Sequence, residues 1–424
     1  MILLKNIKAI PMIEENLIYE NVNILIEGNR IVKISKDKID AKDAYKIDGT
    51  CKLVIPGLIN LHTHLGMSFF KNIADDLNLM DWLEKEIWPR EAKLTPEDIE
   101  LATKYSIMEA IKSGTSTLVD MYNPSSLIAR SMEEMGVRGL VSYGVIDNEK
   151  PIDEKIEEIE EAFLEFKDSD LVTVNPGPHA VYTVSRESFI KLRDLALKLN
   201  TPLHIHLSET LSEVQNTIKE FSKTPVEYLD DMGIFNAKTI AAHCVHLEDK
   251  DFEILAKRNV SVAHNPCSNL KLASGIADVQ KMLDMGINVG LGTDSSSSNN
   301  NLDMFEEMKF ASLLAKVKSN SPTSLKAYKV LEMATVNGAR AIGMENELGK
   351  IKEGFLADLA IIDLSGVNLN PLNNLISCLV YSANSSNVDS LIVNGKILLE
   401  GGKLKILGQD TLMNLANKRK EAYK

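Results

Sequence analysis

The sequence has few cysteines and no excess of positive charge. Its four cysteines, Cys51, Cys244, Cys267 and Cys378, lie far apart and form no CxxC pair. This spacing argues against a disulfide framework and against a thiolate zinc site, and it fits a reducing cytoplasm. The formal net charge is −13, and no cluster of lysine and arginine stands out, so the surface would repel nucleic-acid phosphates. We therefore expect a small-molecule partner and no nucleic acid.

Long hydrophobic runs are also missing. No apolar run reaches the roughly 18 residues that a membrane span needs, and the N-terminal segment has no long apolar stretch followed by a small-residue cleavage site. The sequence therefore predicts no membrane association, no export and a cytoplasmic location. With 424 residues, of which 44% are hydrophobic, the chain can bury a large core and form more than one structural unit.

Short β-rich runs occupy both ends of the chain. Residues 1–53 alternate such runs with turns, one of them at a Gly-Asn pair, and residues 346–400 return to this style with Asn-Gly and Gly-Gly pairs. Such pairs are typical of hairpin turns. We expect residues 1–53 and 346–424 to build one small β-sandwich domain together. A charged helical tail, TLMNLANKRKEAYK, closes the second part.

The middle of the chain, residues 54–345, has a different pattern. Eight strand-like runs are mostly followed by amphipathic helical stretches, which predicts an α/β fold of the TIM-type (β/α)8 barrel class. A doubly wound open sheet is the alternative, but its first strand would more often lead into a glycine-rich phosphate turn than into GLINLHTH. The runs are KLVIPGLINLHTH, TSTLVDM, VRGLVSYGVID, LVTVNPGPHA, TPLHIHLSE, KTIAAHCVH, VSVAHNP and INVGLGTD.

Histidines are distributed unevenly. All eight lie within the strand-like runs or just after them, and active sites of such barrels lie at the carboxyl ends of the strands. His62 and His64 end the first run, and strand residues two apart point to the same face, so their imidazoles can share one ion. The eight are His62, His64, His179, His204, His206, His243, His246 and His264.

These residue types indicate a metal centre. Imidazoles with one carboxylate suit a divalent ion of the zinc, iron or manganese type and leave a position open for water. Asp294 ends the eighth run and supplies the carboxylate. We predict one divalent metal per subunit, Zn²⁺ in the first place and Fe²⁺, Mn²⁺ or Ni²⁺ as alternatives, with His62, His64, His206 and Asp294 as ligands.

Other side chains near the predicted ligands are candidates for catalysis. Glu209 follows His206 by three residues and is expected to transfer protons, the alternative being a solvated loop glutamate. His243 ends the sixth run and is expected to be catalytic, whereas His179 is expected to touch substrate. His204 lies one pleat below His206, which favours a hydrogen-bonded core residue.

A long connection runs from His64 to residue 93. It carries Phe69, Leu79, Trp82 and Trp88, which either roof a bound ring or pack a helix against the barrel.

Seven motifs together resemble the amidohydrolase superfamily. More narrowly, they are similar to its adenosine-type deaminases, the methylthioadenosine/S-adenosylhomocysteine deaminase and 5′-deoxyadenosine deaminase group. The similarity runs nearly end to end. The motifs are PGLINLHTH, ADDLNLMDWLEKEIWPREAKL, GPHAVYT, HIHLSET, AAHCVHL, HNPCSNLKLASG and GTDSSSSNN.

The resemblance implies a mononuclear zinc-type site with the four ligands named above, and substrate contacts from Glu91, His179, Glu209 and Asp294. It also implies metal-dependent hydrolytic loss of ammonia from an adenosine-type nucleoside, and a homo-oligomer, either a dimer or a tetramer. Glu209 can protonate the ring nitrogen, Asp294 can take the proton of water, and His243 can stabilise the tetrahedral species.

Other functions remain open on the same scaffold. Guanine deaminase and triazine-type aminohydrolase or chlorohydrolase share the ligand set, but Glu91 is suited to pair with two ribose hydroxyls and so favours a nucleoside. A non-catalytic assembly protein is a remote alternative, because every expected ligand is present.

The chain departs from the family pattern at one end of the expected substrate. Family members that handle S-adenosylhomocysteine well carry arginine in the strand corresponding to VSYGVID and in the loop after it. Tyr143 takes the first position here, and the loop DNEKPIDEK has no arginine. We therefore expect a nucleoside with a small neutral 5′ group to be preferred. The charged loop residues are Asp147, Glu149, Lys150, Asp153, Glu154 and Lys155.

Overall fold

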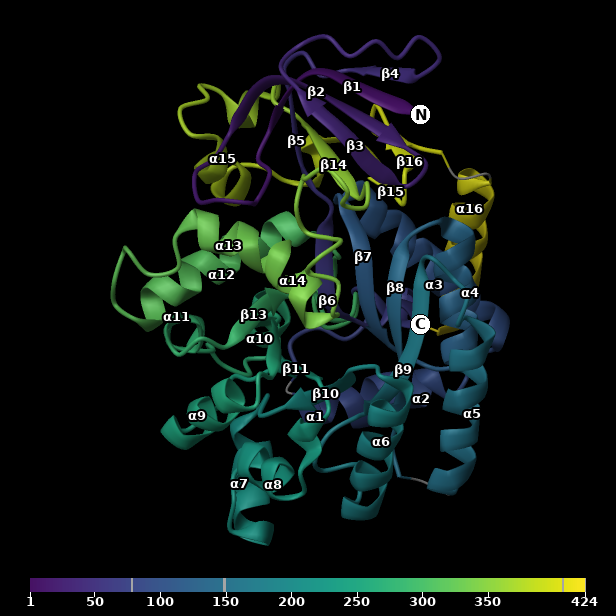
Figure 1. Cartoon of the computed structure of the whole chain (residues 1–424). Coiled ribbons are helices and arrows are strands. Elements are labelled where there is room, and N and C mark those ends of the chain that lie inside the picture. Colours follow the sequence, from purple (N-terminus) through teal and green to yellow (C-terminus); the bar gives the residue numbers. More distant parts are fainter. Residues whose placement is uncertain (78, 148–149, 406–407, 424) are drawn as a thin grey trace.

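The computed structural model describes residues 1–77, 79–147, 150–405 and 408–423. Strands and helices alternate through the middle of the chain, and strands from both ends gather in one sheet beside them (Figure 1). This is the α/β arrangement that the sequence predicts. Among the described residues, none of the helices has both the length and the apolar character needed to cross a membrane.

Eight parallel strands in the middle of the chain match the eight predicted runs. They pair as two four-stranded sheets, in the orders β6-β7-β8-β9 and β10-β11-β12-β13. Each strand is almost wholly buried, which explains why the runs are rich in apolar residues. The strands are β6 (Leu58–Thr63), β7 (Thr115–Met121), β8 (Arg138–Val145), β9 (Val172–Pro178), β10 (Leu203–Leu207), β11 (Thr239–His243), β12 (Ser261–His264) and β13 (Asn288–Leu291).

The two sheets adjoin along two seams, where β9 lies beside β10 and β13 beside β6. Ladder pairing does not continue across either seam among the described residues, so the expected closed barrel is not confirmed. Pro176 and Pro178 in β9 have no N–H to donate to a ladder. At the other seam the Asn60 side chain takes the place of a strand partner, accepting the Thr293 N–H at 3.0 Å and donating to its hydroxyl at 2.8 Å.

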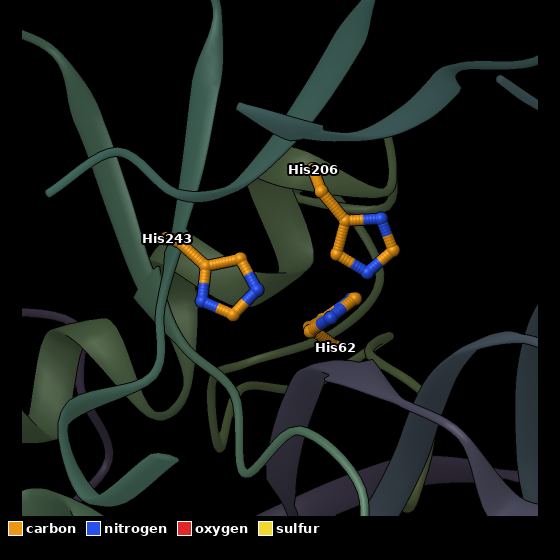
Figure 2. A group of neighbouring side chains, drawn as sticks. All are labelled: His62, His206 and His243. Carbon is orange, nitrogen blue, oxygen red and sulfur yellow. The ribbon is translucent and has the colours of Figure 1, made fainter. Parts of the chain in front are cut away.

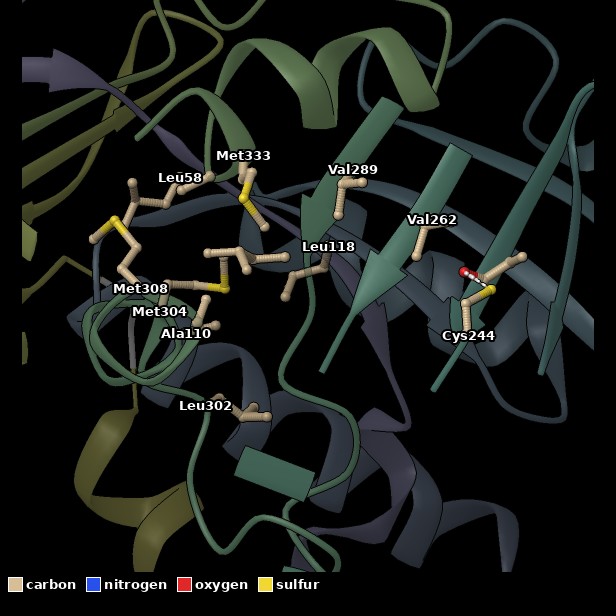
Figure 3. Close-up of a cluster of buried hydrophobic side chains, with 14 of the residues drawn as sticks. Leu58, Ala110, Leu118, Cys244, Val262, Val289, Leu302, Met304, Met308 and Met333 are labelled. Carbon is tan, nitrogen blue, oxygen red and sulfur yellow. Dashed lines mark hydrogen bonds between the residues drawn. The ribbon is translucent and has the colours of Figure 1, made fainter. Parts of the chain in front are cut away.

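Helices pack outside the parallel strands. Side chains such as Leu118 of β7, Met308 of α12 and Met333 of α13 fill the space between the two layers (Figure 3). The helices are α3 (Pro96–Lys112), α4 (Ser125–Met135), α5 (Ile152–Glu165), α6 (Arg186–Leu199), α7 (Leu211–Phe221), α8 (Pro225–Asp231), α9 (Asp249–Lys257), α10 (Pro266–Lys271), α11 (Val279–Asp284), α12 (Met304–Lys318), α13 (Ala327–Met333) and α14 (Val336–Ala341).

The strands of the two chain ends form one sheet. Its order is β17-β16-β15-β14-β5-β1-β2-β3, with β4 paired to β1, so two facing sheets, and hence the expected β-sandwich, are not confirmed. The predicted Gly-Asn, Asn-Gly and Gly-Gly hairpins are confirmed. The strands are β1 (Ile2–Ala9), β2 (Tyr19–Glu27), β3 (Arg30–Ser35), β4 (Tyr45–Asp48), β5 (Lys52–Pro56), β14 (Leu359–Asp363), β15 (Val388–Val393), β16 (Lys396–Glu400) and β17 (Lys403–Leu404).

The first predicted run, KLVIPGLINLHTH, splits at Gly57 into β5 of the end sheet and β6 of the parallel strands. A Cβ atom on Gly57 would lie 2.4 Å from the Ser116 hydroxyl oxygen, so only glycine fits this crossing. The division of the chain into domains at residues 53 and 345 stays a prediction.

Two further segments complete the fold. The connection after His64 forms η1 (Leu65–Phe70), α1 (Leu79–Asp81), η2 (Trp82–Ile87) and α2 (Trp88–Glu91), and we call residues 65–77 and 79–91 the lid. After the end sheet, α16 (Gln409–Arg419) and η6 (Lys420–Tyr423) return to lie beside α3 (Figure 1). The remaining elements are η3 (Ile234–Asn236), η4 (Val367–Leu369), α15 (Leu375–Tyr381) and η5 (Ser385–Asn387).

Candidate active site

The four predicted metal ligands come together at the carboxyl ends of the strands. His62 lies in β6 and His64 follows it, His206 lies in β10, and Asp294 follows β13. The backbone at Asp294 has a φ of 63°, a left-handed conformation that costs free energy outside glycine and often marks a functional site.

The spacing of the ligand atoms suits one small ion. His64 Nε2 lies 3.3 Å from His206 Nε2, and Asp294 Oδ1 lies 3.4 Å from His62 Nε2 and 3.3 Å from His64 Nε2. An ion bound tetrahedrally at about 2.0–2.1 Å would hold neighbouring ligand atoms about 3.3 Å apart. The rings of His62, His206 and His243 also face one another (Figure 2), and their ligand atoms lie within 4.8 Å.

The second nitrogen of each imidazole is held by a hydrogen bond. His64 Nδ1–H donates to the carbonyl oxygen of Met121 at 2.6 Å, and His206 Nδ1–H donates to that of His179 at 2.9 Å. A proton at Nδ1 leaves Nε2 of a neutral ring free for a metal. Burial lowers the pKa of His64, but the Asp294 carboxylate raises it to about 9, so metal binding at this ring displaces a proton. His62 Nε2 is buried without a hydrogen-bond partner among the described residues. This donor set fits a divalent metal ion.

A buried relay fixes the orientation of His62. Its Nδ1–H donates to His204 Nε2 at 2.9 Å, His204 Nδ1–H donates to the Ser142 hydroxyl at 3.0 Å, and this hydroxyl donates to Asn175 Oδ1 at 3.0 Å. Burial lowers the pKa of His62 to about 4 and that of His204 well below its usual range, so both rings are neutral. The expectation of a hydrogen-bonded core residue at His204 is confirmed.

Asp294 is ionised and tightly held. Burial would raise its pKa, but the imidazoles of His62 and His64, at 3.4 and 3.3 Å from Oδ1, lower it well below the usual range. The hydroxyls of Ser268 and Ser298 donate to Oδ2 at 2.6 and 3.0 Å. These contacts leave Oδ1 aimed at the two imidazoles.

Glu209 lies in the same site and is only 5% exposed, so the alternative of a solvated loop residue is wrong. Burial raises its pKa. The Ser274 hydroxyl donates to Oε1 at 3.1 Å, and Oε2 lies 3.8 Å from His243 Nε2. His243 Nδ1–H donates to Asn269 Oδ1 at 2.8 Å, which directs the other ring nitrogen toward Glu209.

A cavity of about 350 Å³ opens above these groups, large enough for a small organic ligand. Leu79, Trp82 and Trp88 of the lid line it, as expected of a roof, whereas Phe69 does not line it and packs in a buried cluster that also contains Trp82. Within the described residues, no lysine or arginine lines this cavity. The polar and charged lining residues are His64, Glu91, Tyr122, Asn123, His179, Tyr182, His206, Glu209, His243, Asp294 and Ser295.

Glu91 and His179 face the cavity as expected. Glu91 accepts a hydrogen bond from the Tyr122 hydroxyl at 2.7 Å, and burial raises its pKa. His179 Nδ1–H donates to the Thr183 hydroxyl at 2.9 Å. Burial lowers the pKa of His179 to about 3, so the neutral ring presents a hydrogen-bond acceptor at Nε2.

Among their described residues, Tyr143 and its loop bring no cation to the cavity. The Tyr143 hydroxyl donates to Glu158 at 2.5 Å and Lys150 pairs with the same carboxylate. Glu149 lies outside the described residues. Ile146, directly before this loop, lines the cavity.

Two supporting residues were missed from the sequence. Tyr122 directly follows β7, and its ring occupies the space left by Gly66, where a Cβ would lie 2.3 Å from the ring. Glu213 accepts the backbone N–H groups of Ser208 and Glu209 at 3.0 and 2.8 Å. The sequence signals that could have found them are the position of Tyr122 at the end of a strand and the position of Glu213 four residues after Glu209.

Comparison with known proteins defines the class. Residues 53–398 match the model of the Amidohydrolase family, and the chain belongs to this family. It is 46% identical over 422 residues to the 5-methylthioadenosine/S-adenosylhomocysteine deaminase of Caldanaerobacter subterraneus subsp. tengcongensis, covering 99% of this chain and 97% of the relative.

Two further similarities are informative. The chain is 45% identical over 399 residues to the 5′-deoxyadenosine deaminase of Methanothermobacter thermautotrophicus, covering 93% of each chain. The crystal structure of an adenosine deaminase from Xanthomonas campestris with bound zinc superposes with a TM-score of 0.96 at 32% identity, covering 100% of this chain and 98% of the other.

Proposed function

We propose that this protein is a metal-dependent hydrolytic deaminase of adenosine-type nucleosides. The substrates are 5′-deoxyadenosine, 5′-methylthioadenosine, S-adenosylhomocysteine and adenosine, and the products are the inosine analogue and ammonia. One observation carries the proposal: three imidazole Nε2 atoms and the Asp294 carboxylate converge beside Glu209, in a cavity that also contains Glu91. The names of the relatives with 45% and 46% identity support it.

We assign one ion per chain, zinc in the first place, to His62, His64, His206 and Asp294. Such an ion, when bound, lowers the pKa of a water molecule toward about 7 and so supplies a nucleophile at neutral pH. We assign His243 to the reacting groups instead, because its Nε2 faces the Glu209 carboxylate.

The reaction joins the oxygen of water to C6 of the adenine ring and breaks the bond from C6 to the amino nitrogen. Glu209 donates a proton to N1 of the ring as the oxygen adds, and it recovers a proton from the new C6 hydroxyl as the carbonyl forms; its raised pKa favours this role. Asp294 accepts the proton of the attacking water and returns it to the departing nitrogen, which leaves as ammonia. His243 hydrogen-bonds the oxygen that develops charge.

The other residues fix the substrate. Glu91 accepts hydrogen bonds from the two ribose hydroxyls, with one carboxylate oxygen already oriented by Tyr122. Neutral His179 accepts a hydrogen bond from the substrate. The apolar lining near Ile146, without a cation, favours a small neutral group at the 5′ position.

Glu91 also separates this function from the alternatives. Guanine and triazines have no ribose, so binding either one would leave the partly buried carboxylate without its hydroxyl partners, which costs about 1–3 kcal/mol. We further expect a homo-oligomer, a dimer or a tetramer, which light scattering of the purified protein measures directly.

The proposal is tested by ultraviolet absorbance, which follows the conversion of adenine to hypoxanthine. We expect turnover of adenosine-type nucleosides and none of guanine or triazines, with about one equivalent of divalent metal per chain. His206→Ala should lose metal and activity together, while His246→Ala, which removes a histidine bonded to the Ser274 carbonyl, should keep its metal. Two tightly bound ions per chain, or turnover of guanine alone, would contradict the proposal.

A further inference from the structure

The C-terminal segment is anchored against the outer side of the lid. Tyr423 in η6 is only 4% exposed. Its ring stacks on Phe69, with centroids 6.0 Å apart, and meets the ring of Phe70 edge-on at 6.2 Å. Both phenylalanines belong to η1, which begins directly after His64. A residue more than 300 positions away in the sequence thus contacts the segment next to a candidate ligand.

Polar contacts fix the same tyrosine. Its hydroxyl donates to Asp98 Oδ2 at 2.5 Å, and its carbonyl oxygen accepts the Arg90 Nε–H at 3.0 Å. Arg419 of α16 lies 3.3 Å from the other oxygen of Asp98. Asp98 caps α3 and is buried, so it is a fixed anchor. Arg90 directly precedes Glu91, so the contact reaches the residue assigned to the ribose.

An apolar cluster connects the C-terminal segment to the cavity wall. Met67, Trp82, Ile87 and Leu272 line the cavity, and they pack in one cluster with Ala416 and Tyr423.

The lid has little regular structure of its own. The helix α1 has three residues, η2 is a π-helix of six, and α2 has four. Helices this short are unstable by themselves because nucleation is costly, and their order comes from packing. Residues that pack against the side of the lid opposite the cavity can hold the lid in place without filling the space for substrate.

We propose that Tyr423 is a positioning residue, and that residues 409–423 hold the lid over the cavity and thereby keep Glu91 in place. Tyr423 does not line the cavity, and it acts through Phe69, Phe70 and Arg90. This inference deepens the proposed function and rests on it only for the identity of the ligand.

Tryptophan fluorescence reports on the environment of the lid. The two tryptophans of the chain, Trp82 and Trp88, both belong to the lid and line the cavity. In metal-loaded Tyr423→Ala, below its unfolding temperature, we expect red-shifted emission and stronger quenching by acrylamide. Tyr423→Phe keeps the ring and should lie between this variant and the wild type. Tyr328→Ala removes another buried tyrosine, in α13, and should leave the emission unchanged.

Kinetics with 5′-deoxyadenosine give the second readout. If the lid of Tyr423→Ala is closed for a tenth of the time, KM rises about tenfold, whereas kcat changes less than about twofold and metal content stays the same. If the wild type turns over no nucleoside, the proposed function fails, but the fluorescence still decides the role of Tyr423. Unchanged emission in Tyr423→Ala would overturn the inference, and so would an unchanged KM with kcat and metal content falling together.

Discussion

The relay behind His62 can be interrupted by a single substitution. In His204→Phe the new ring fills a similar space but has no acceptor for the His62 Nδ1–H, which is fully buried. An unpaired buried donor costs about 1–3 kcal/mol. His62 escapes this cost by moving its proton to Nε2, but that proton blocks the ligand atom. Either outcome weakens metal binding.

The magnitude follows from the same contact. Removing a hydrogen-bond partner behind a ligating histidine typically lowers metal affinity about 10–100-fold, which corresponds to about 1.4–2.8 kcal/mol. This range matches the cost of one unpaired donor. Ser142→Ala breaks the relay one step further away, at the contact between His204 and Ser142. His204 still accepts the hydrogen bond from His62 Nδ1–H, so we expect a smaller loss of metal affinity.

Competition with a chelator of known zinc affinity measures the effect. Thr239→Val is the matched control, because it removes a buried hydroxyl of neighbouring β11 that donates to the Ala237 carbonyl oxygen, away from the relay. Its metal affinity should equal that of the wild type. If His204→Phe binds zinc as tightly as the control, the relay does not set the proton position of His62 and the reasoning fails.

Four other outcomes test the remaining assignments. Glu209→Gln should keep its metal while kcat falls at least about 10²-fold. A kcat close to that of the wild type, measured at saturating nucleoside, would remove Glu209 from the mechanism. Glu91→Ala should damage turnover of nucleosides far more than any turnover of free adenine, and equal losses would assign Glu91 to lid support. Burial raises the pKa of Glu213 from 4.5 to about 7, so the folded state binds this proton more tightly than the unfolded chain does. The resulting contribution to the free energy of unfolding is complete below about pH 4.5. It is lost as the pH rises through about 7, by up to about 3 kcal/mol. Denaturation of Glu213→Gln across this range should therefore show a weaker decline than the wild type, and parallel declines would contradict the assignment. Competition kinetics should favour 5′-deoxyadenosine over S-adenosylhomocysteine by at least about tenfold in kcat/KM, with methylthioadenosine between them or close to the former; the highest kcat/KM on S-adenosylhomocysteine would refute this preference.

Much of the parallel strand pattern was predictable because each buried strand is a short apolar run bounded by turns. TSTLVDM coincides with β7 (Thr115–Met121), and INVGLGTD contains β13 (Asn288–Leu291). The convergence of His62, His206 and Asp294 was predictable for a related reason. Strands of this architecture run parallel, so residues at their carboxyl ends meet at the same edge.

Features set by distant contacts were not predictable. The split of the first run at Gly57 depends on the approach of Ser116, and one apolar run contains no sign of a change of sheet. The end strands alternate and turn in the same way whether they form one sheet or two, so the nine-stranded sheet was indistinguishable from a sandwich. Tyr423 gives no sequence signal for its role, since its partners lie near residues 69 and 98.

The charges around the cavity bear on both chemistry and selectivity. Glu91, Glu209 and Asp294 face it, and no lysine or arginine joins them within the described part of the chain. Protonation of the ring nitrogen gives the reacting purine positive charge, which nearby carboxylates stabilise more than they stabilise the neutral substrate. The same carboxylates repel the anionic end of an amino-acid substituent, whose charge would enter a low-dielectric cavity without a partner. Under the proposed function, this arrangement of charge predicts loss of the amino group at one end of a nucleoside and a preference for a neutral group at the other.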